Sequence, residues 1–256
     1  MLTVEKVFGV GAWRQRQTIP RRRFGVPVGG PWDCEASELA LALLRKEPRE
    51  PVFEVLVGTA ELRAREAGTI SAVGTDGMVS AGTSSLPLGV RLPVGEGDLI
   101  RVHARCAYVA WTSQRLSQAR LDWRSGPIQA LRYLASQSDA DAYEVVVSPV
   151  SSRAGMRLTG LSPTVREERP SEPCCVGAIQ QTPGGELIII GPDGPTIGGY
   201  SRLGTVIEAD LNLIPRLEIG SKIQIVPITL DNALKCGSEA RERSFSILKG
   251  LRANGS

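Results

Sequence analysis

The sequence predicts a mainly β (α+β) protein, folded as a barrel or a sandwich. Short runs of alternating apolar and polar residues, such as PVFEVLVG, AYEVVVSPV and SKIQIVPIT, are bounded by glycine and proline. The 256 residues include 28 glycines and 17 prolines, which is typical of short strands joined by tight turns. Helical periodicity is confined to a few segments, so we expect a β fold with few helices rather than a doubly wound parallel sheet.

The first helix is predicted at residues 33–46. Its apolar stripe has the helical period and comprises Ala36, Leu39, Ala40, Leu43 and Leu44. Asp33 is a natural N-cap, and Pro48 prevents continuation. The preceding loop, FGVPVGGPW, could hold an anion at the helix N-terminus, but it contains no phosphate-binding motif. Because Asp33 would occupy the anion's position, we favour a structural turn with a helix cap over a ligand loop.

Three more helices are expected. Residues 127–136 place Ile128, Leu131 and Leu134 on one side, and Asp210 is expected to cap a short helix. The tail from Ser238 to Leu251 has an apolar stripe made of Phe245, Leu248 and Leu251.

One pattern occurs twice, as GDLIRV at 97–102 and GSKIQI at 220–225. Each run begins with a glycine turn and continues as an alternating strand. The repetition indicates either two related β-rich subdomains or the same turn chemistry reached independently.

Cysteine and histidine usage limits the possible sites. The five cysteines form no C-x-x-C pair, and Cys174 and Cys175 are adjacent, which suits neither a zinc site nor a disulfide framework. His103 is the only histidine, so a multi-histidine metal site is excluded. It alternates with Ile100 and Val102, and we therefore expect it on the polar face of a strand, not in catalysis.

Charge and hydropathy indicate neither nucleic acid nor membrane as a partner. The net charge is +3, and the triplet at 21–23 (RRR) is interpreted as a solvated edge, or else as a contact for a phosphate or an acidic partner. No apolar run reaches the length of a membrane span, and no secretory signal is visible at the start, so a cytoplasmic protein is expected.

Several motifs together resemble a known family. GVPVGGPWD is similar to that family's G-V-P-x-S-G-A-M-D, and FEVLVGTAELRA to its L-E-x-x-x-G-G-P-x-L. The segment from VGAIQQTPGG through IGGY, GTVI and ADL to GSKIQI follows the family's P-G-A-I-Q-V-P-x-x-G, T-G-G-Y, G-T-V-I, A-D-L and G-D-x-I. The family comprises KipA-like proteins, also called allophanate hydrolase subunit 2 or the C subunit of 5-oxoprolinase, and the matching carboxyltransferase half of urea carboxylase.

The resemblance implies a cyclophilin-like β-barrel architecture in two β-rich subdomains. On this basis we expect an N-terminal subdomain at 1–115, a shortened connector with a helix at 116–142, a cyclophilin-like subdomain at 143–234, and a C-terminal helix and tail at 235–256. It also implies a partner, a KipI-like protein that forms a hetero-oligomer with this chain. The sequence has no Walker A motif and no A-M-K-M tetrapeptide, so ATP or carboxybiotin would act through partner subunits.

The departures from the family are mostly polar. The family's S-D-R-M-G-x-R-L is SSRAGMRL here, without the aspartate, and Q-T-T-G-G-Y-P is PTIGGYS. The central G-S-R-S-T segment has no counterpart. Two functions follow: an enzyme subunit, either of an ATP-dependent amidohydrolase or of a biotin-dependent carboxyltransferase, or a non-catalytic scaffold or regulatory protein that keeps the fold.

No catalytic residue can be assigned from the sequence, but a binding site can be predicted. The loop containing Gly198 and Gly199 lets backbone amides approach a ligand closely, and hydroxyl and guanidinium groups add donors. Because donors exceed acceptors, the site suits a carboxylate or a ureido group. The predicted substrate-binding residues are Arg153, Arg157, Thr196, Gly198, Gly199 and Tyr200. The alternative is a turn with ion-paired arginines.

Overall fold

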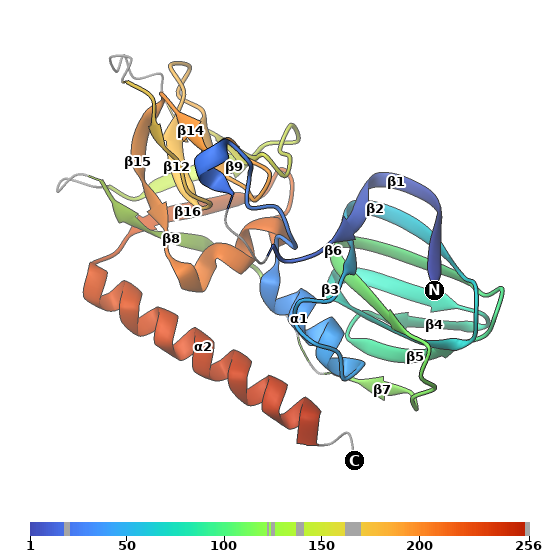
Figure 1. The fold of residues 1–256 in the computed structure, drawn as a ribbon. Coiled ribbons are helices and arrows are strands. Elements are labelled where there is room, and N and C mark those ends of the chain that lie inside the picture. Colours follow the sequence, from blue (N-terminus) through green and yellow to red (C-terminus); the bar gives the residue numbers. More distant parts are fainter. Residues whose placement is uncertain (18–20, 122, 124–125, 137–140, 162–169, 254–256) are drawn as a thin grey trace. The chain divides into compact units, whose positions relative to one another are not determined.

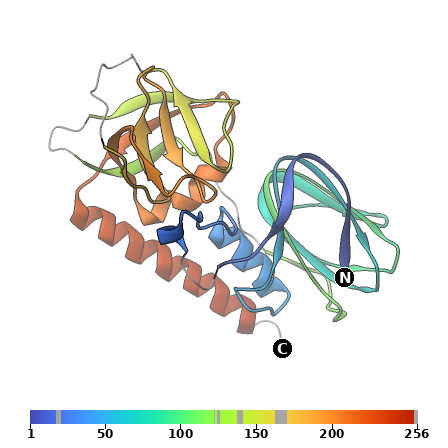
Figure 2. The same cartoon turned by 45° about the horizontal axis from the view of Figure 1, so that its top comes forward.

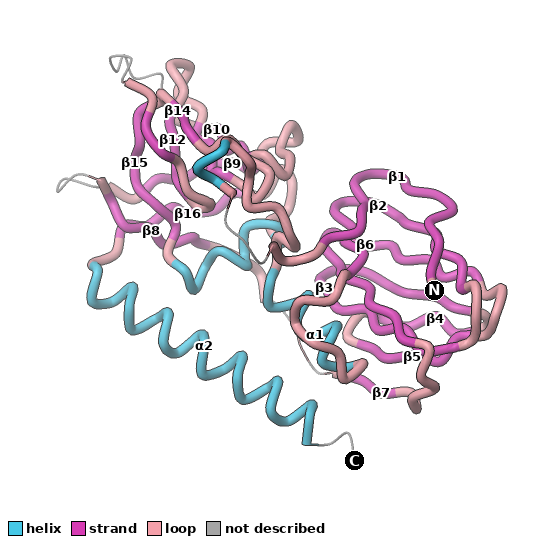
Figure 3. The backbone as a smooth tube through the Cα atoms, viewed as in Figure 1, coloured by secondary structure: helices cyan, strands magenta, loops and turns pink. Residues whose placement is uncertain are grey.

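The structure is a computed structural model that describes residues 1–17, 21–121, 123, 126–136, 141–161 and 170–253. Its contacts divide the chain into two compact units that alternate along the sequence. Unit 1 comprises Met1–Arg16, Asp33–Gly126 and Ser244–Ser256, and unit 2 comprises Gln17–Trp32 and Pro127–Arg243. The consecutive segments expected from the sequence, with boundaries at 115, 142 and 234, stay a prediction. Both units are rich in strands, which confirms the predicted mainly β fold (Figure 3).

Unit 1 is built on one antiparallel sheet with the strand order β1-β2-β6-β3-β5-β7, and β4 pairs with β3 (Figure 1). The strands are β1 (Leu2–Arg14), β2 (Val52–Ala64), β3 (Gly68–Ala81), β4 (Ser84–Pro87), β5 (Val90–Val94), β6 (Leu99–Thr112) and β7 (Ala119–Arg120). Alternate side chains of these strands form its apolar core, which includes Val55, Leu62, Ile70, Leu92 and Val109.

Helix α1 (Cys34–Leu43) packs on β3 and β6 of this sheet. Asp33 caps it as predicted, since its Oδ1 accepts the Ala36 amide hydrogen at 3.0 Å. The helix ends at Leu43, three residues before the predicted end. There Arg91 donates to the Leu43 carbonyl at 2.9 Å, so a cation lies at the negative end of the helix.

Unit 2 contains a closed barrel with the order β10-β13-β12-β15-β8-β16-β9 (Figure 2). The barrel strands are β8 (Ala130–Ala135), β9 (Tyr143–Val147), β10 (Gly155–Thr159), β12 (Ala178–Gln181), β13 (Leu187–Ile190), β15 (Ser201–Val206) and β16 (Lys222–Pro227). Only β8 and β16 are parallel, among the pairs described. Buried residues such as Tyr133, Val147, Leu158, Ile189 and Ile225 fill its core. Closure leaves this sheet without edges.

Smaller elements complete unit 2. A two-stranded ladder joins β11 (Glu172–Pro173) to β14 (Ile197–Gly198), and one 3₁₀ turn, η1 (Arg22–Phe24), precedes α1. A second 3₁₀ segment, η2 (Glu208–Arg216), follows β15. The long helix α2 (Leu230–Ala253) begins in unit 2 and ends in unit 1.

One predicted helix and one predicted cap are wrong, although a short 3₁₀ segment does lie where a short helix was expected. Residues 127–136 contain the strand β8, in which Leu131 and Tyr133 are buried and the pairing partners are β15 and β16. The spacing of Ile128, Leu131 and Leu134 imitates a helical stripe, but barrel pairing outweighs it. Asp210 is not a cap: it lies inside η2, and its carboxylate binds the side chain and backbone amide of Arg132 on β8.

The tail helix is longer than predicted, since α2 starts at Leu230 rather than Ser238. Phe245 does not belong to a buried stripe, because it is 67% exposed. His103 agrees with the prediction: it is exposed on β6 and hydrogen-bonds through Nδ1 to the Thr59 hydroxyl at 2.9 Å.

The repeated pattern has one local structure in both units. Gly97 and Gly220 have φ of 83° and 82°, and the next residue donates its amide hydrogen three residues back, from Asp98 to Gly95 and from Ser221 to Glu218. The strands that follow differ in their neighbours. β6 pairs antiparallel with β2 and β3, whereas β16 pairs antiparallel with β9 and parallel with β8. Among the described residues, no helix is long and apolar enough to cross a membrane.

Candidate functional site

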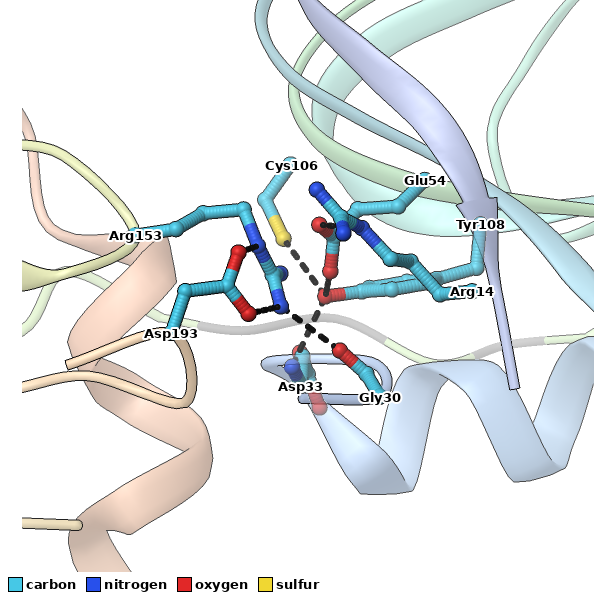
Figure 4. A network of polar contacts seen from close by, with 8 residues as sticks. All are labelled: Arg14, Gly30, Asp33, Glu54, Cys106, Tyr108, Arg153 and Asp193. Atoms are coloured by element: carbon cyan, nitrogen blue, oxygen red, sulfur yellow. Dashed lines mark hydrogen bonds and ion pairs between the residues drawn. The ribbon is translucent and has the colours of Figure 1, made fainter. Parts of the chain in front are cut away.

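Arg153 is buried just before β10 in unit 2, where it forms a two-pronged ion pair (Figure 4). Its Nε lies 2.7 Å from Asp193 Oδ2, and its Nη2 lies 2.9 Å from Asp193 Oδ1. The same Nη2 donates to the Gly30 carbonyl at 2.7 Å. Asp193 therefore offsets the guanidinium charge, and these contacts hold the glycine-rich loop before α1.

That loop also contacts the 191–194 turn directly. Gly29 donates its amide hydrogen to the Pro192 carbonyl at 2.8 Å. Gly191 has no room for a side chain, because a Cβ there would collide with the Arg153 carbonyl and meet Trp32 at 3.3 Å. These contacts hold the loop in place within unit 2. This agrees with its interpretation as a structural turn and not a ligand loop.

Arg157 is placed on β10 and pairs with Glu186, which precedes β13. Its side chain is partly exposed. Both predicted arginines therefore have carboxylate partners, as the alternative interpretation of the sequence expects.

The predicted glycine loop contains β14, one strand of the β11–β14 ladder. Gly198 is in β14 opposite Glu172, and the Thr196 carbonyl accepts the Cys174 amide hydrogen at 2.9 Å. Gly199 is half-buried, and Tyr200 is 47% exposed. One short segment, 196–200, thus contains four of the predicted site residues: Thr196, Gly198, Gly199 and Tyr200.

Gln180 adds a group that the sequence-based prediction missed. It is 3% exposed on β12, and its Nε2 lies 3.0 Å from the Cys174 sulfur. A Cβ at Gly198 would lie 2.7 Å from this Nε2, so the absence of a side chain makes the room for the carboxamide. We call Cys174, Gln180 and Gly198 the Gln180 cluster.

A register shift brings Gln180 to this place. β12 pairs Ile179 with Gly204 but Gln180 with Arg202, so Leu203 has no opposite residue. Such bulges turn side chains away from regular alternation and are frequent beside sites. The GAIQQ run was the available signal, but nothing in it distinguishes a ligand-binding glutamine from a strand residue.

The Gln180 cluster can form hydrogen bonds with a ligand, but it contains no group that can act as a base. Burial is the largest influence on the Cys174 thiol and raises its pKa, while the Gln180 hydrogen bond acts in the opposite direction. The thiol is therefore protonated at neutral pH. Within the described residues, no donor reaches the carboxamide Oε1 of Gln180, which is left with acceptor capacity.

Unit 1 has a separate buried polar network at the start of α1 (Figure 4). The Tyr108 hydroxyl accepts the Asp33 amide hydrogen at 2.7 Å and donates to Glu54 Oε2 at 2.9 Å. Arg14 Nε lies 3.4 Å from Glu54 Oε1. Each carboxylate has a structural task, capping for Asp33 and pairing for Glu54, so we interpret the network as an anchor for the helix.

The described part of the chain has no group of three or more His, Cys, Asp or Glu side chains that could hold a metal ion.

Comparison with known proteins identifies relatives of this chain. The model of the family "Carboxyltransferase domain, subdomain A and B" matches residues 24–112 and 110–227. The C subunit of 5-oxoprolinase from Escherichia coli (strain K12) is 30% identical over 162 residues, which are 62% of this chain and 50% of the relative. The chain thus aligns with about half the length of that relative.

Two solved structures share the fold. Urea amidolyase of Kluyveromyces lactis superposes with a TM-score of 0.81 at 18% identity, over 96% of this chain and 20% of that one. Urea carboxylase of the same organism gives 0.78 at 19% identity, over 95% of this chain and 29% of that one.

Proposed function

Because the chain belongs to the carboxyltransferase-domain family, with subdomains A and B, we propose that it binds a small amide or ureido substrate for a multi-subunit enzyme. The enzyme would be of the 5-oxoprolinase, allophanate hydrolase or urea carboxylase type. The proposed site is the Gln180 cluster with the adjoining loop residues Thr196, Gly199 and Tyr200. The observation that carries the proposal is the buried Gln180 carboxamide, whose Oε1 accepts no hydrogen bond from a described residue.

The ion pairs of the two predicted arginines favour recognition of the amide or ureido group of a ligand over recognition of its carboxylate. Arg153 is offset by Asp193, and Arg157 by Glu186, so neither guanidinium offers the full charge that a carboxylate requires. The carboxamide of Gln180 can donate a hydrogen bond to the carbonyl of an amide or ureido group and accept one from its N–H. Arg153 then has an indirect role: it holds the glycine-rich loop in position, because it binds both the Gly30 carbonyl and Asp193.

The chemistry would be shared with a partner. The Gln180 cluster contains a carboxamide, a protonated thiol and backbone, and none of these can remove a proton at neutral pH. We propose that a KipI-like partner protein completes the site and that ATP or carboxybiotin acts through partner subunits. The Escherichia coli relative is by its name one component of a 5-oxoprolinase, which supports an assembly of this kind.

A non-catalytic scaffold is the second candidate. The lack of a base in the Gln180 cluster favours it, as do both ion-paired arginines. A scaffold would bind the partner protein without binding any of the small substrates, and this difference can be measured.

The test is calorimetric titration of 5-oxoproline, urea and allophanate into the wild type, with and without the KipI-like partner. Gln180→Leu removes the carboxamide, and Gln181→Leu is the matched control because adjacent strand residues point to opposite faces. Loss of the hydrogen bonds to a buried amide costs about 1–3 kcal/mol, so we expect about 5- to 150-fold weaker binding for Gln180→Leu alone. Binding that both variants leave intact would place the site elsewhere. Absence of binding even with the KipI-like partner would favour the scaffold.

A further inference from the structure

The two adjacent cysteines of unit 2 have opposite environments. Cys174 is 5% exposed and contacts Gln180, whereas Cys175 is exposed. Arg202, on β15, brings its Nη2 to 3.6 Å from the Cys175 sulfur and to 2.8 Å from the Thr205 hydroxyl. One thiol thus faces solvent beside a guanidinium, and the next lies in the proposed site.

The thiols and the guanidinium act on one another electrostatically. Burial is the main influence on the Cys174 pKa and raises it, while Arg202 lowers it and Cys175 raises it. Cys174 is therefore shielded and protonated, and Cys175 is the thiol that a solute can reach. An accessible thiol with a second thiol nearby allows the second thiol to react with a sulfenic acid formed on the first.

We infer that Cys175 is a modification site: peroxide oxidises it, and Cys174 then forms a disulfide with it that weakens ligand binding. The chemical step stands on the two thiols alone, while its consequence for binding rests on the proposed function. Because the Cys174 sulfur would leave Gln180, the carboxamide would lose the neighbour that orients it.

The steps balance with peroxide as the oxidant. The Cys175 sulfur attacks the O–O bond, so an S–O bond forms, the O–O bond breaks, and water leaves with the thiol proton; sulfur is oxidised and peroxide reduced. The Cys174 sulfur then attacks the Cys175 sulfur. An S–S bond forms, the S–O bond breaks, and a second water leaves with the Cys174 proton.

The product is expected to be easily reduced. Neighbouring Cα atoms are about 3.8 Å apart across a trans peptide, while most disulfides span roughly 4.4–6.8 Å. The resulting strain favours the dithiol, which is a property of regulatory rather than structural disulfides.

The experiment treats the full chain with hydrogen peroxide, counts thiols after denaturation, and weighs the peptide that contains both cysteines. We expect the wild type to lose two of its five thiols, a dithiol reductant to restore them, and the peptide to become lighter by two hydrogens. Cys174→Ser should stop at a sulfenic acid that dimedone traps on Cys175, and Cys175→Ser should keep Cys174 reduced. Cys236→Ser, a half-buried cysteine outside the pair, is the control and should form the disulfide as the wild type does.

A wild-type peptide that keeps both thiols, or equally fast oxidation of Cys174 in Cys175→Ser, would overturn the inference. Ligand binding is measured separately on the oxidised and the re-reduced protein. Formation of the disulfide with unchanged binding would overturn its link to the site. If the reduced protein binds no ligand, the proposed function fails, while the thiol count still decides the chemical step.

Discussion

At the scale of single residues, the candidate site depends on a glycine that leaves room for a glutamine. A Cβ on Gly198 would lie 2.7 Å from Gln180 Nε2 and 3.0 Å from the Cys174 sulfur. Both are ends of side chains, which can move without breaking the barrel. Gly198 therefore contributes more to the shape of the site than to the stability of the fold.

We expect Gly198→Ala to weaken ligand binding by about tenfold or more, because the displaced carboxamide loses its orientation. The midpoint of denaturant unfolding should change little. Gly184→Ala is the matched control, since its nearest neighbour, the Thr182 hydroxyl, would be at 3.9 Å. Binding by Gly198→Ala at wild-type strength would show that the carboxamide is not where the ligand binds.

Asp33 is the second informative residue, because it is fully buried and caps α1. Asp33→Ala should lower the free energy of unfolding by roughly 0.5–2 kcal/mol, since the Ala36 amide hydrogen loses its acceptor. Denaturant unfolding measures this. Asp33→Asn keeps an acceptor and should lose less. Equal stability of all three proteins, combined with loss of ligand or partner binding, would give Asp33 a functional role instead.

Asp33 and Gln180 show which features of the site the sequence could and could not predict. The Asp33 cap follows from local spacing, since the cap, the apolar stripe and the final proline are all within sixteen residues. The Gln180 cluster joins β12, β14 and the residue that follows β11, and it depends on a bulge at Leu203 of β15. Local patterns carry no information about such pairing, so Gln180 was missed while its neighbour Gly198 was found.

At the scale of elements, Tyr108 links β6 to β2 and to the start of α1 through one hydroxyl group. Burial, which is the largest cause, and the nearby Cys106, Glu54 and Asp33 raise its pKa well above the ordinary value. In the unfolded chain a tyrosine ionises near about pH 10. Above that pH the unfolded state therefore binds fewer protons than the folded state, so the contribution of Tyr108 to stability is lost as the pH rises.

We expect Tyr108→Phe to be less stable than the wild type by about 1–3 kcal/mol at about pH 8, because Glu54 and the Asp33 amide lose their partner. The difference should narrow at about pH 11, where the wild type alone bears the cost of keeping this tyrosine protonated. Unfolding midpoints at the two pH values measure it. Tyr200→Phe, at a half-exposed position, is the control and should match the wild type. A difference that stays constant or widens would contradict the assignment.

The wrong predictions for β8 and for Asp210 have a common cause. β8 was expected to be a helix because three apolar residues fit a 3.6-residue period, yet Leu131 and Tyr133 alternate inward between β15 and β16. Asp210 was expected to cap a helix, but it binds Arg132 of that same strand. In both cases a partner distant in the sequence decides the local structure.

At the scale of the whole molecule, the family assignment agrees with the mainly β fold. The buried polar network and the candidate binding site lie in different units. Unit 1 holds the buried network that we interpret as an anchor for α1, and unit 2 holds the Gln180 cluster and the predicted glycine loop. The chain aligns with about half of the Escherichia coli relative, so the activity of a complete assembly stays a proposal. The central claim is that unit 2 recognises a neutral amide or ureido group through Gln180.

A crystal structure of the protein soaked in urea or 5-oxoproline tests this claim most directly. The account predicts a ligand nitrogen at about 2.7–3.2 Å from Gln180 Oε1, to which it donates a hydrogen bond beside the 196–200 loop, and no ligand density there in crystals of Gln180→Leu. A ligand bound against Arg153 and Asp193, or one that keeps its place in Gln180→Leu, would contradict it.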